Sequence, residues 1–142
     1  RQMCIRDRGL TGFGDLREVH RLVKEGNEDA KLALDIYVHR IVGYIGNYTA
    51  QMGGVDVITF TAGVGENDDV VRKMVCDKLA PFGVKLDEEK NATRSKEPRI
   101  ISTPDSAVTI CVIPTNEELA IARKSAAIAE EGKDSYGNVF SK

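Results

Sequence analysis

The segment Val57-Ile58-Thr59-Phe60-Thr61-Ala62-Gly63-Val64-Gly65-Glu66-Asn67 decides the fold. Its first residues are β-branched or aromatic, and they predict a strand that we place at residues 55–60. Thr61 to Asn67 contain two glycines, which predict a loop. The acidic pair Asp68-Asp69 then predicts the start of a helix over about residues 68–80. In α/β proteins, ligands bind where strands end in loops of this kind.

Two helices are predicted before this segment. Asp15 can cap a short helix that runs through Arg17 and Val19. A second helix, over about residues 28–52, begins after an asparagine and ends at Gly53-Gly54. Apolar residues recur along this helix at steps of three and four, and others lie outside that stripe. Its apolar surface is therefore broader than one contact would cover.

Short strands and one more helix are predicted after the segment. The charged stretch 87–99 is expected to be a solvated helix and turn. Val108 to Ile113 is nearly continuously apolar, as is typical of a strand covered on both faces. Pro114 ends that strand, and a helix follows over about residues 116–131. Shorter strands are expected at 84–86 and 100–101. This order predicts an α/β fold with a small, mostly parallel sheet flanked by helices.

Composition argues against several classes of function. The 142 residues carry a formal net charge of -2, which disfavours a nucleic-acid-binding protein. No apolar run reaches the length of a membrane-spanning helix. Cys4, Cys76 and Cys111 lack the spacing of a disulfide framework or a zinc site and fit a reducing compartment. His20 and His39 have no neighbour in the sequence that would make either one a general base. A Mg²⁺ site, which needs only oxygen ligands, stays open.

The glycine segment has two interpretations. Gly63 and Gly65 would let a ligand approach the backbone closely or allow a left-handed φ. The segment is not a P-loop, because no Gly-Lys-Ser/Thr follows, and it is not a dinucleotide fingerprint, because Asp68 stands where a third glycine is required. The acidic residues that follow would repel phosphate, so a nucleotide bound here should present its adenine or ribose. Local features alone favour the other interpretation, a tight turn between strand and helix.

Two more segments hold candidate ligand-binding residues. Thr115 and Glu118 fit a capping box at the start of the last helix. The cap does not need Glu117, which either favours the helix dipole or holds Mg²⁺, and the residues alone favour the dipole. In Asp15-Leu16-Arg17 the arginine could clamp a phosphate, but a solvent-exposed ion pair is the default interpretation.

Together these segments resemble the acetate kinase family over roughly residues 9–130. Phe60 to Asn67 is similar to the family's Thr-Ala-Gly-Ile-Gly-Glu-Asn loop, with Val64 for the usual isoleucine. Asp68 stands where a serine is common, and both residues can cap a helix. Two further stretches match in order and spacing: Val112-Ile113-Pro114-Thr115-Asn116-Glu117-Glu118-Leu119, similar to the C-terminal signature, and Gly14-Asp15-Leu16-Arg17, similar to the Asp-x-Arg element.

The resemblance implies part of an actin/hexokinase-like (ribonuclease H-like) ATPase domain. It implies an enzyme that transfers the γ-phosphoryl group of ATP reversibly to acetate or another short carboxylic acid, with Mg²⁺ or Mn²⁺. By motif match, Glu117 would be the metal ligand. The nucleotide-binding residues would be Asp15, Leu16, Arg17, Gly63, Val64, Gly65, Glu66 and Asn67. The family is cytoplasmic and forms homodimers largely through this domain, which suits the broad apolar surface of the helix at 28–52.

We expect residues 9–131 to be part of a C-terminal nucleotide-binding domain. Residues 1–8 resemble translated sequencing-adapter sequence, which predicts a non-native leader, and residues 132–142 are predicted to be a flexible tail. The family's substrate-binding arginines and its catalytic histidine and aspartate would lie upstream, so no catalytic residue is assigned and the chain alone is expected to be inactive. The alternative is a stand-alone nucleotide-binding or interaction module in which the glycine segment is only a turn.

Overall fold

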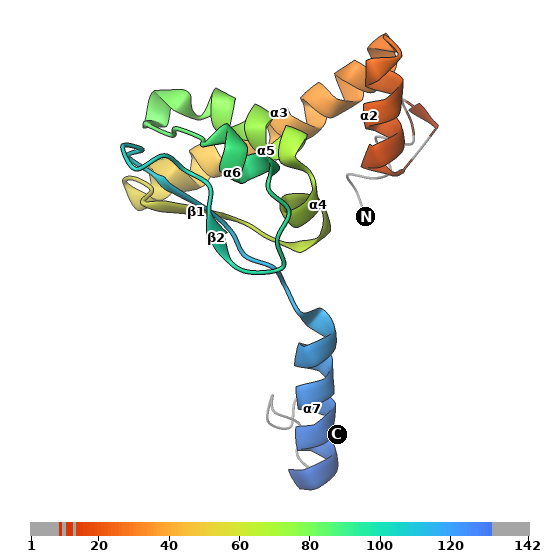
Figure 1. The fold of residues 1–142 in the computed structure, drawn as a ribbon, viewed down its shortest axis with the longest axis vertical. Coiled ribbons are helices and arrows are strands. Elements are labelled where there is room, and N and C mark those ends of the chain that lie inside the picture. Colours follow the sequence, from red (N-terminus) through yellow and green to blue (C-terminus); the bar gives the residue numbers. More distant parts are fainter. Residues whose placement is uncertain (1–8, 10, 13, 132–142) are drawn as a thin grey trace.

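Three short strands form the sheet at the centre of the fold (Figure 1). The computed structural model describes residues 9, 11, 12 and 14–131, and the leader predicted at 1–8 and the tail predicted at 132–142 lie outside them. The strands are β1 (Val57–Phe60), β2 (Arg99–Ile100) and β3 (Thr109–Val112). β1 pairs with β3 in parallel, and β2 pairs with the other side of β3 in antiparallel orientation. The predicted α/β fold with a small, mostly parallel sheet is confirmed, although its edge strand β2 is antiparallel.

The pairing of β1 and β3 determines where a ligand could bind. Phe60 pairs with Val112, and the N–H of Ile113 donates to the Phe60 carbonyl at 2.9 Å. The carboxyl ends of the two parallel strands therefore lie at one edge of the sheet. Ligands of α/β proteins bind at such an edge, so the chain that follows each strand is the first place to look for a site.

Local caps set the limits of the two helices before the sheet. α2 (Leu16–Lys24) begins after an aspartate cap, as predicted. α3 (Glu28–Met52) begins after Asn27, whose side chain accepts a hydrogen bond from the Ala30 N–H at 2.9 Å. It ends at Gly53, which has a left-handed φ of 74° that a residue with a Cβ adopts only with strain. Both helices therefore have the limits that their capping residues predict.

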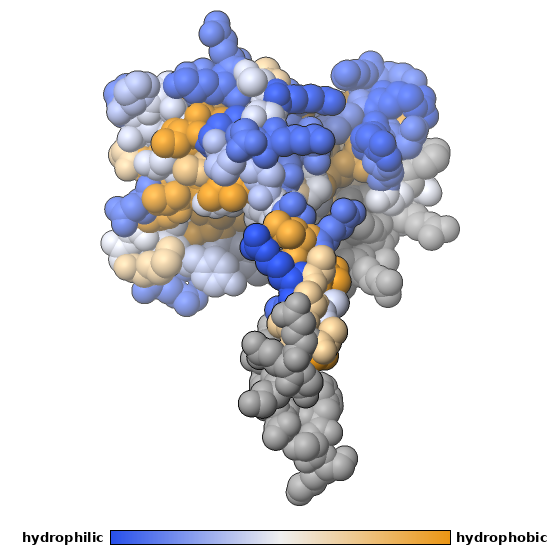
Figure 2. Space-filling model, turned by 60° about the horizontal axis from the view of Figure 1, so that its bottom comes forward, coloured by the Kyte–Doolittle hydropathy of each residue, from blue (hydrophilic) through white to orange (hydrophobic). Residues whose placement is uncertain are grey.

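One face of the sheet carries the core. α5 (Asp69–Lys78) and α3 supply helical residues to this core, where Val75 and Ile110 are fully buried. On the other face Val57 and Ile100 are more than half exposed. Figure 2, which brings the lower side of the domain forward, shows apolar surface there. β3 itself is buried on its core face and half-buried at Thr109 and Cys111 on the other, so among the described residues its predicted full cover is found on one face.

The glycine segment after β1 is a short helix, α4 (Ala62–Asn67), so the prediction of a loop over 61–67 is wrong. Glycine has a poor helix propensity, which is why the sequence favours a loop. The helix is held by the side-chain amide of Asn67, which donates to the Gly63 carbonyl at 2.8 Å.

The two glycines of α4 have different structural roles. Neither adopts a left-handed φ, and Ala62, at φ 59°, makes that turn instead. A Cβ at residue 65 would lie 3.2 Å from the carbonyl carbon of Phe60, a tight contact, so glycine favours the close packing of α4 against β1. A Cβ at residue 63 would meet nothing within 4 Å, so packing does not require Gly63.

Arg72, on α5, is a buried charge that joins three helices. Only 2% of its surface is exposed. Its guanidinium donates to the carbonyls of Gly65 and Glu66 at 2.9 Å, and to the side chain and carbonyl of Asn91 at 2.7 Å. These carbonyls belong to the last turns of α4 and of α6 (Glu88–Ala92), where the helix dipole is negative. Two helix ends therefore compensate the buried charge.

The segment between α5 and β2 differs from the prediction in three respects. η1 (Ala80–Phe82), a 3₁₀ turn, follows α5, which ends at Lys78. A single bridge between Leu86 and Ser102 replaces the strand predicted at 84–86. The stretch predicted to be solvated also contributes a core contact, because Asn91 of α6 is buried by its bonds to Arg72.

The last helix, α7 (Glu117–Glu131), projects away from the sheet (Figure 1). Leu119, Ile121 and Ile128 are exposed along it. Across the described part of the chain, no helix combines the length and the hydropathy that a membrane span requires.

Replacing the buried guanidinium should destabilise the fold strongly. Arg72→Ala leaves four acceptor oxygens without their donor, two of them buried on Asn91 and two part-buried on Gly65 and Glu66, so the free energy of unfolding should fall by roughly 2–5 kcal/mol. The matched control is Arg40→Ala, because Arg40 is exposed on α3, where it donates to the Tyr44 hydroxyl. That change should stay within about 0.5 kcal/mol. Urea denaturation measures both, and equal losses would contradict the role of Arg72.

Candidate functional site

A polar pocket lies where the chain leaves the carboxyl ends of β1 and β3. It has a volume of about 420 Å³, which is large enough for a small ligand. Gly63 and Glu66 line it from α4, and Thr115, Asn116 and Glu118 line it from the start of α7. The structure thus brings together two segments that lie about fifty residues apart in the sequence and that both carry predicted site residues.

Glu66 joins the two walls of this pocket. Its Oε1 accepts hydrogen bonds from the Thr115 N–H at 2.8 Å and from the Thr115 hydroxyl at 3.0 Å. The Thr115 N–H is the main cause of a lowered pKa for Glu66, because it stabilises the ionised carboxylate. Glu66 is therefore a structural link between α4 and the start of α7, a role that its place in the glycine motif does not reveal.

Asn116 caps α7. Its Oδ1 accepts a hydrogen bond from the Leu119 N–H at 2.9 Å, as an N-cap side chain does. The predicted capping box of Thr115 and Glu118 is wrong, because the Thr115 hydroxyl donates to Glu66 and the helix starts one residue later. Glu118 is thereby left to line the pocket.

The remaining residues of α4 support the helix. Val64 packs against the core, and the Asn67 side chain is bonded to Gly63 within α4. Gly65 lies against β1, and its carbonyl accepts from Arg72. Within α4, Gly63 therefore exposes its backbone to the pocket.

The pocket is acidic. Its described lining includes the carboxylates Glu66 and Glu118 and no lysine or arginine. It would repel a bare phosphate, whereas an uncharged nucleoside or a metal-bound phosphate would be accepted. The oxygen donors suit Mg²⁺, which takes one or two protein carboxylates and keeps several waters. Two carboxylates line the pocket, and the described residues contain no group of three or more His, Cys, Asp or Glu that could hold a metal ion. Glu117 is the first residue of α7, and its side chain lies outside the described part.

Asp15 and Arg17 form an exposed ion pair at the start of α2. The Arg17 Nη2 lies 2.6 Å from the Asp15 Oδ2, and the two side chains are 89% and 47% exposed. Hydrogen bonds from Arg17 lower the pKa of Asp15 to about 2. Neither residue lines the pocket, and Leu16 between them packs against the core. The default interpretation, a solvent-exposed ion pair, describes this geometry.

Sequence reasoning missed the contact between His20 and Asp68. The His20 Nε2 lies 2.7 Å from the Asp68 Oδ2, and both side chains are largely buried. The two residues are 48 positions apart, so the pair depends on how α2 packs against the rest of the domain and no local pattern could have revealed it.

The sheet and its helices are those of part of an actin/hexokinase-like ATPase domain. The crystal structure of Porphyromonas gingivalis acetate kinase is similar, with a TM-score of 0.76 and 43% identity over 87% of this chain and 31% of that chain. The acetate kinase of Entamoeba histolytica gives a TM-score of 0.78 at 30% identity, over 84% of this chain and 32% of that one.

The acetokinase family model matches residues 7–123, and the chain belongs to this family. This confirms the resemblance inferred from the motifs. Curated acetate kinases of Oleidesulfovibrio alaskensis and Carboxydothermus hydrogenoformans are 53% and 56% identical to it, each over 82% of this chain. The matched region is only 29% of each relative, so most of their length has no counterpart in this chain.

The amide of Thr115 should report the ionisation of Glu66. Folding lowers the Glu66 pKa from its ordinary 4.5. The bond from Thr115 to the ionised carboxylate therefore stabilises the fold fully above pH 4.5, and this stabilisation is lost as the pH falls through the lower pKa of the folded state. The Thr115 amide shift, followed by NMR, should therefore titrate with a midpoint below 4.5, and Glu66→Gln should abolish this titration. Glu28→Gln, at the start of α3 and outside the pocket, is the control and should leave the midpoint unchanged. Persistence of the titration in Glu66→Gln would show that another group is the partner of Thr115.

Proposed function

We propose that the full-length protein containing this chain transfers the γ-phosphoryl group of ATP to acetate, reversibly, forming acetyl phosphate and ADP. The observation that carries the proposal is the pocket between the ends of β1 and β3, in a chain 53–56% identical to curated acetate kinases. In the reaction, a carboxylate oxygen of acetate bonds to the γ-phosphorus while the bond from that phosphorus to the β–γ bridging oxygen breaks. ADP leaves with the bridging oxygen.

In this proposal the nucleotide lies against α4 and the start of α2. The open space beside Gly63 supports it, because a ligand can approach the backbone there. The acidic lining favours the uncharged adenosine part over the phosphates at α4. From α2, the exposed guanidinium of Arg17 is available to clamp a phosphate if the nucleotide displaces Asp15. The residues from Gly63 to Asn67 would form the adenosine side of the site.

Glu117 is the proposed metal ligand. Bound Mg²⁺, or Mn²⁺, would neutralise phosphate charge during transfer. The cap made by Asn116 fixes the backbone of the first turn of α7, and with it the backbone position of Glu117. Asn116 and Glu118 add oxygen donors to the same wall of the pocket.

We expect this chain by itself to be inactive. Phosphoryl transfer requires the transferring group to be positioned and its charge stabilised by several groups. The described lining of the pocket supplies carboxylates, a threonine and an asparagine, but no cation. The remaining groups, and the pocket that accepts acetate or another short acid such as propionate, would come from the rest of the protein.

We also propose that the full-length protein is a cytoplasmic homodimer without nucleic-acid or membrane partners. The support for the dimer is the apolar surface of α3, which exposes Leu32, Tyr44, Tyr48 and Met52 by 50%, 48%, 56% and 66%. Aromatic residues and methionine are enriched at protein interfaces, and apolar patches on a protein surface often mark them.

Gly63→Ala should reduce ligand affinity without reducing the stability of the fold. The added Cβ meets nothing in the protein, and alanine favours helix, so stability should be unchanged or rise by up to about 1 kcal/mol. Affinity of the full-length protein for Mg²⁺-ADP, measured by calorimetry, should fall about tenfold or more if adenosine lies against residue 63. Gly65→Ala is the structural comparison and should destabilise the fold through its contact with Phe60. If the folded Gly63→Ala protein binds Mg²⁺-ADP with unchanged affinity, the nucleotide does not lie against α4.

Activity is tested by trapping acetyl phosphate with hydroxylamine. The full-length protein should form acyl hydroxamate from acetate and Mg²⁺-ATP, and Glu117→Ala should reduce the rate about a hundredfold or more. Glu28→Ala is the matched control, because Glu28 is the first residue of α3 as Glu117 is of α7. Each change should cost about 1 kcal/mol of stability or less through the helix dipole, but Glu28→Ala should keep full activity. If acetate and propionate both give no hydroxamate with the wild type, the enzymatic proposal fails and a binding module remains.

A further inference from the structure

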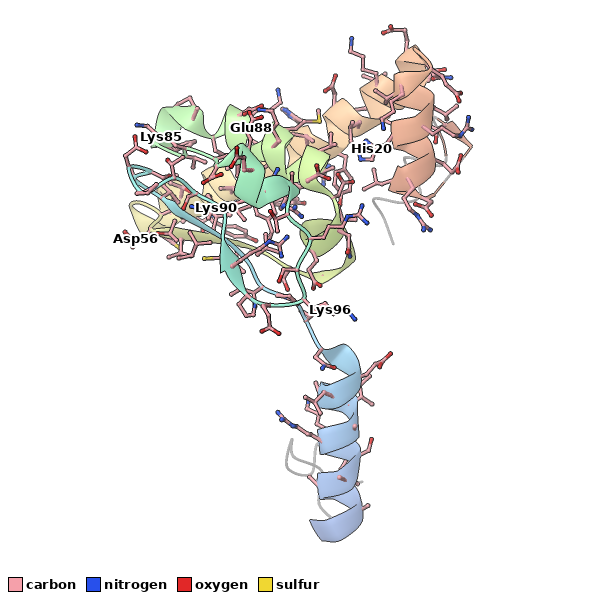
Figure 3. The ribbon with its side chains drawn as sticks, viewed as in Figure 1. His20, Asp56, Lys85, Glu88, Lys90 and Lys96 are labelled. Atoms are coloured by element: carbon pink, nitrogen blue, oxygen red, sulfur yellow. The ribbon has the colours of Figure 1, made fainter. Side chains whose placement is uncertain are left out.

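The contact between His20 and Asp68 ties α2 to the start of α5. Figure 3 labels His20, which comes from α2. Its Nε2 lies 2.7 Å from the Asp68 Oδ2, with only 20% and 13% of the two side chains exposed. The other oxygen of Asp68, Oδ1, caps α5 by accepting from the Val71 N–H at 2.9 Å. Asp68 thus makes two separate bonds, one within α5 and one to α2.

The position of this pair relates it to the site. His20 lies three residues, just under one helical turn, beyond Arg17 on α2. Asp68 directly follows Asn67, the last residue of α4. The pair is therefore a direct bond between the two helical regions that are proposed to hold the nucleotide.

The bond is suited to fixing this geometry. A hydrogen bond to an ionised carboxylate is stronger than one between neutral groups, and partial burial protects it from screening by solvent. The Asp15–Arg17 pair cannot serve this purpose, because both of its members come from the same end of α2 and are exposed. The cap of α5 cannot serve it either, because that bond lies within one helix.

We propose that His20 is a positioning residue, which acts through Asp68 to hold the Asp15–Arg17 segment at a fixed distance from Gly63–Asn67. The proposal rests on the nucleotide-binding role proposed above for these two segments. His20 itself does not touch the nucleotide. Its effect is expected in the affinity for nucleotide and not in the affinity for the carboxylic acid.

His20→Leu and Asp68→Ser each remove the bond, and two further substitutions serve as rescue and control. His20→Leu replaces the imidazole with an apolar side chain that cannot bond Asp68, whereas His20→Gln keeps an N–H donor and should restore much of the function. Asp68→Ser keeps a capping oxygen for α5, since serine is a good N-cap, but is too short to reach His20 as well. His39→Leu is the control, because His39 is exposed on α3.

In the full-length enzyme, His20→Leu and Asp68→Ser should each raise the KM for ATP about five- to tenfold, and their combination should raise it little further, as expected for residues that act through one bond. The KM for acetate should stay unchanged in the two single variants and in the double variant. His20→Gln should recover most of the affinity, and His39→Leu should match the wild type. Additive effects of the two single changes, or equal effects on both substrates, would overturn the positioning role.

A second measurement does not depend on nucleotide. In amide-resolved NMR spectra of this chain, His20→Leu should shift the amides of Gly63–Asn67, and His39→Leu should not. Shifts confined to α2 would overturn the proposed link between the two segments. If the wild-type enzyme fails to bind ATP, the function proposed above fails and the positioning role fails with it. If the wild type binds ATP and His20→Leu binds it equally well, only the positioning role fails.

Discussion

Burial of the Arg72 guanidinium is the constraint on which the rest of the site depends. A charge that is 98% removed from solvent requires hydrogen-bond acceptors, and the chain supplies them from the last turns of two short helices, α4 and α6. Neither helix is long enough to be stable alone. The need to satisfy one buried cation therefore explains why a glycine-containing segment is helical and why part of a charged stretch turns inward.

Glu66 links the part of the fold held by Arg72 to the other wall of the pocket. Its carbonyl accepts from Arg72, and its carboxylate accepts from Thr115. A single residue thus connects the core of the domain to the start of α7, and the ends of β1 and β3 are held together beyond the sheet itself. The resulting pocket is rich in oxygen and negative in charge, so the ligand must be uncharged where it touches α4 or must bring a cation with its phosphates.

The features that could be predicted from the sequence are those set by local bonds. Asn27 and Gly53 define α3 because each acts on backbone within its own turn. The features that could not be predicted depend on partners distant in sequence. α4 depends on a hydrogen bond from Arg72. The Thr115 hydroxyl donates to Glu66 instead of capping α7, and His20 contacts Asp68, which is 48 positions away in the sequence. The pairing of β2, only two residues long, likewise follows from its contact with β3 and not from its own pattern. The motifs predicted the two segments that line the candidate site, whereas the bonds that shape it required the fold.

One metal-bound nucleotide is proposed to bridge the two walls of the pocket. Paramagnetic broadening by Mn²⁺, added with saturating ADP to the isotopically labelled chain, tests this claim most directly. Amide signals of residues 115–118 should broaden most, those of Gly63–Asn67 should shift with ADP and broaden less, and α3 should be unaffected. Strongest broadening away from the start of α7, or ADP-dependent shifts that leave both walls unchanged, would contradict the claim.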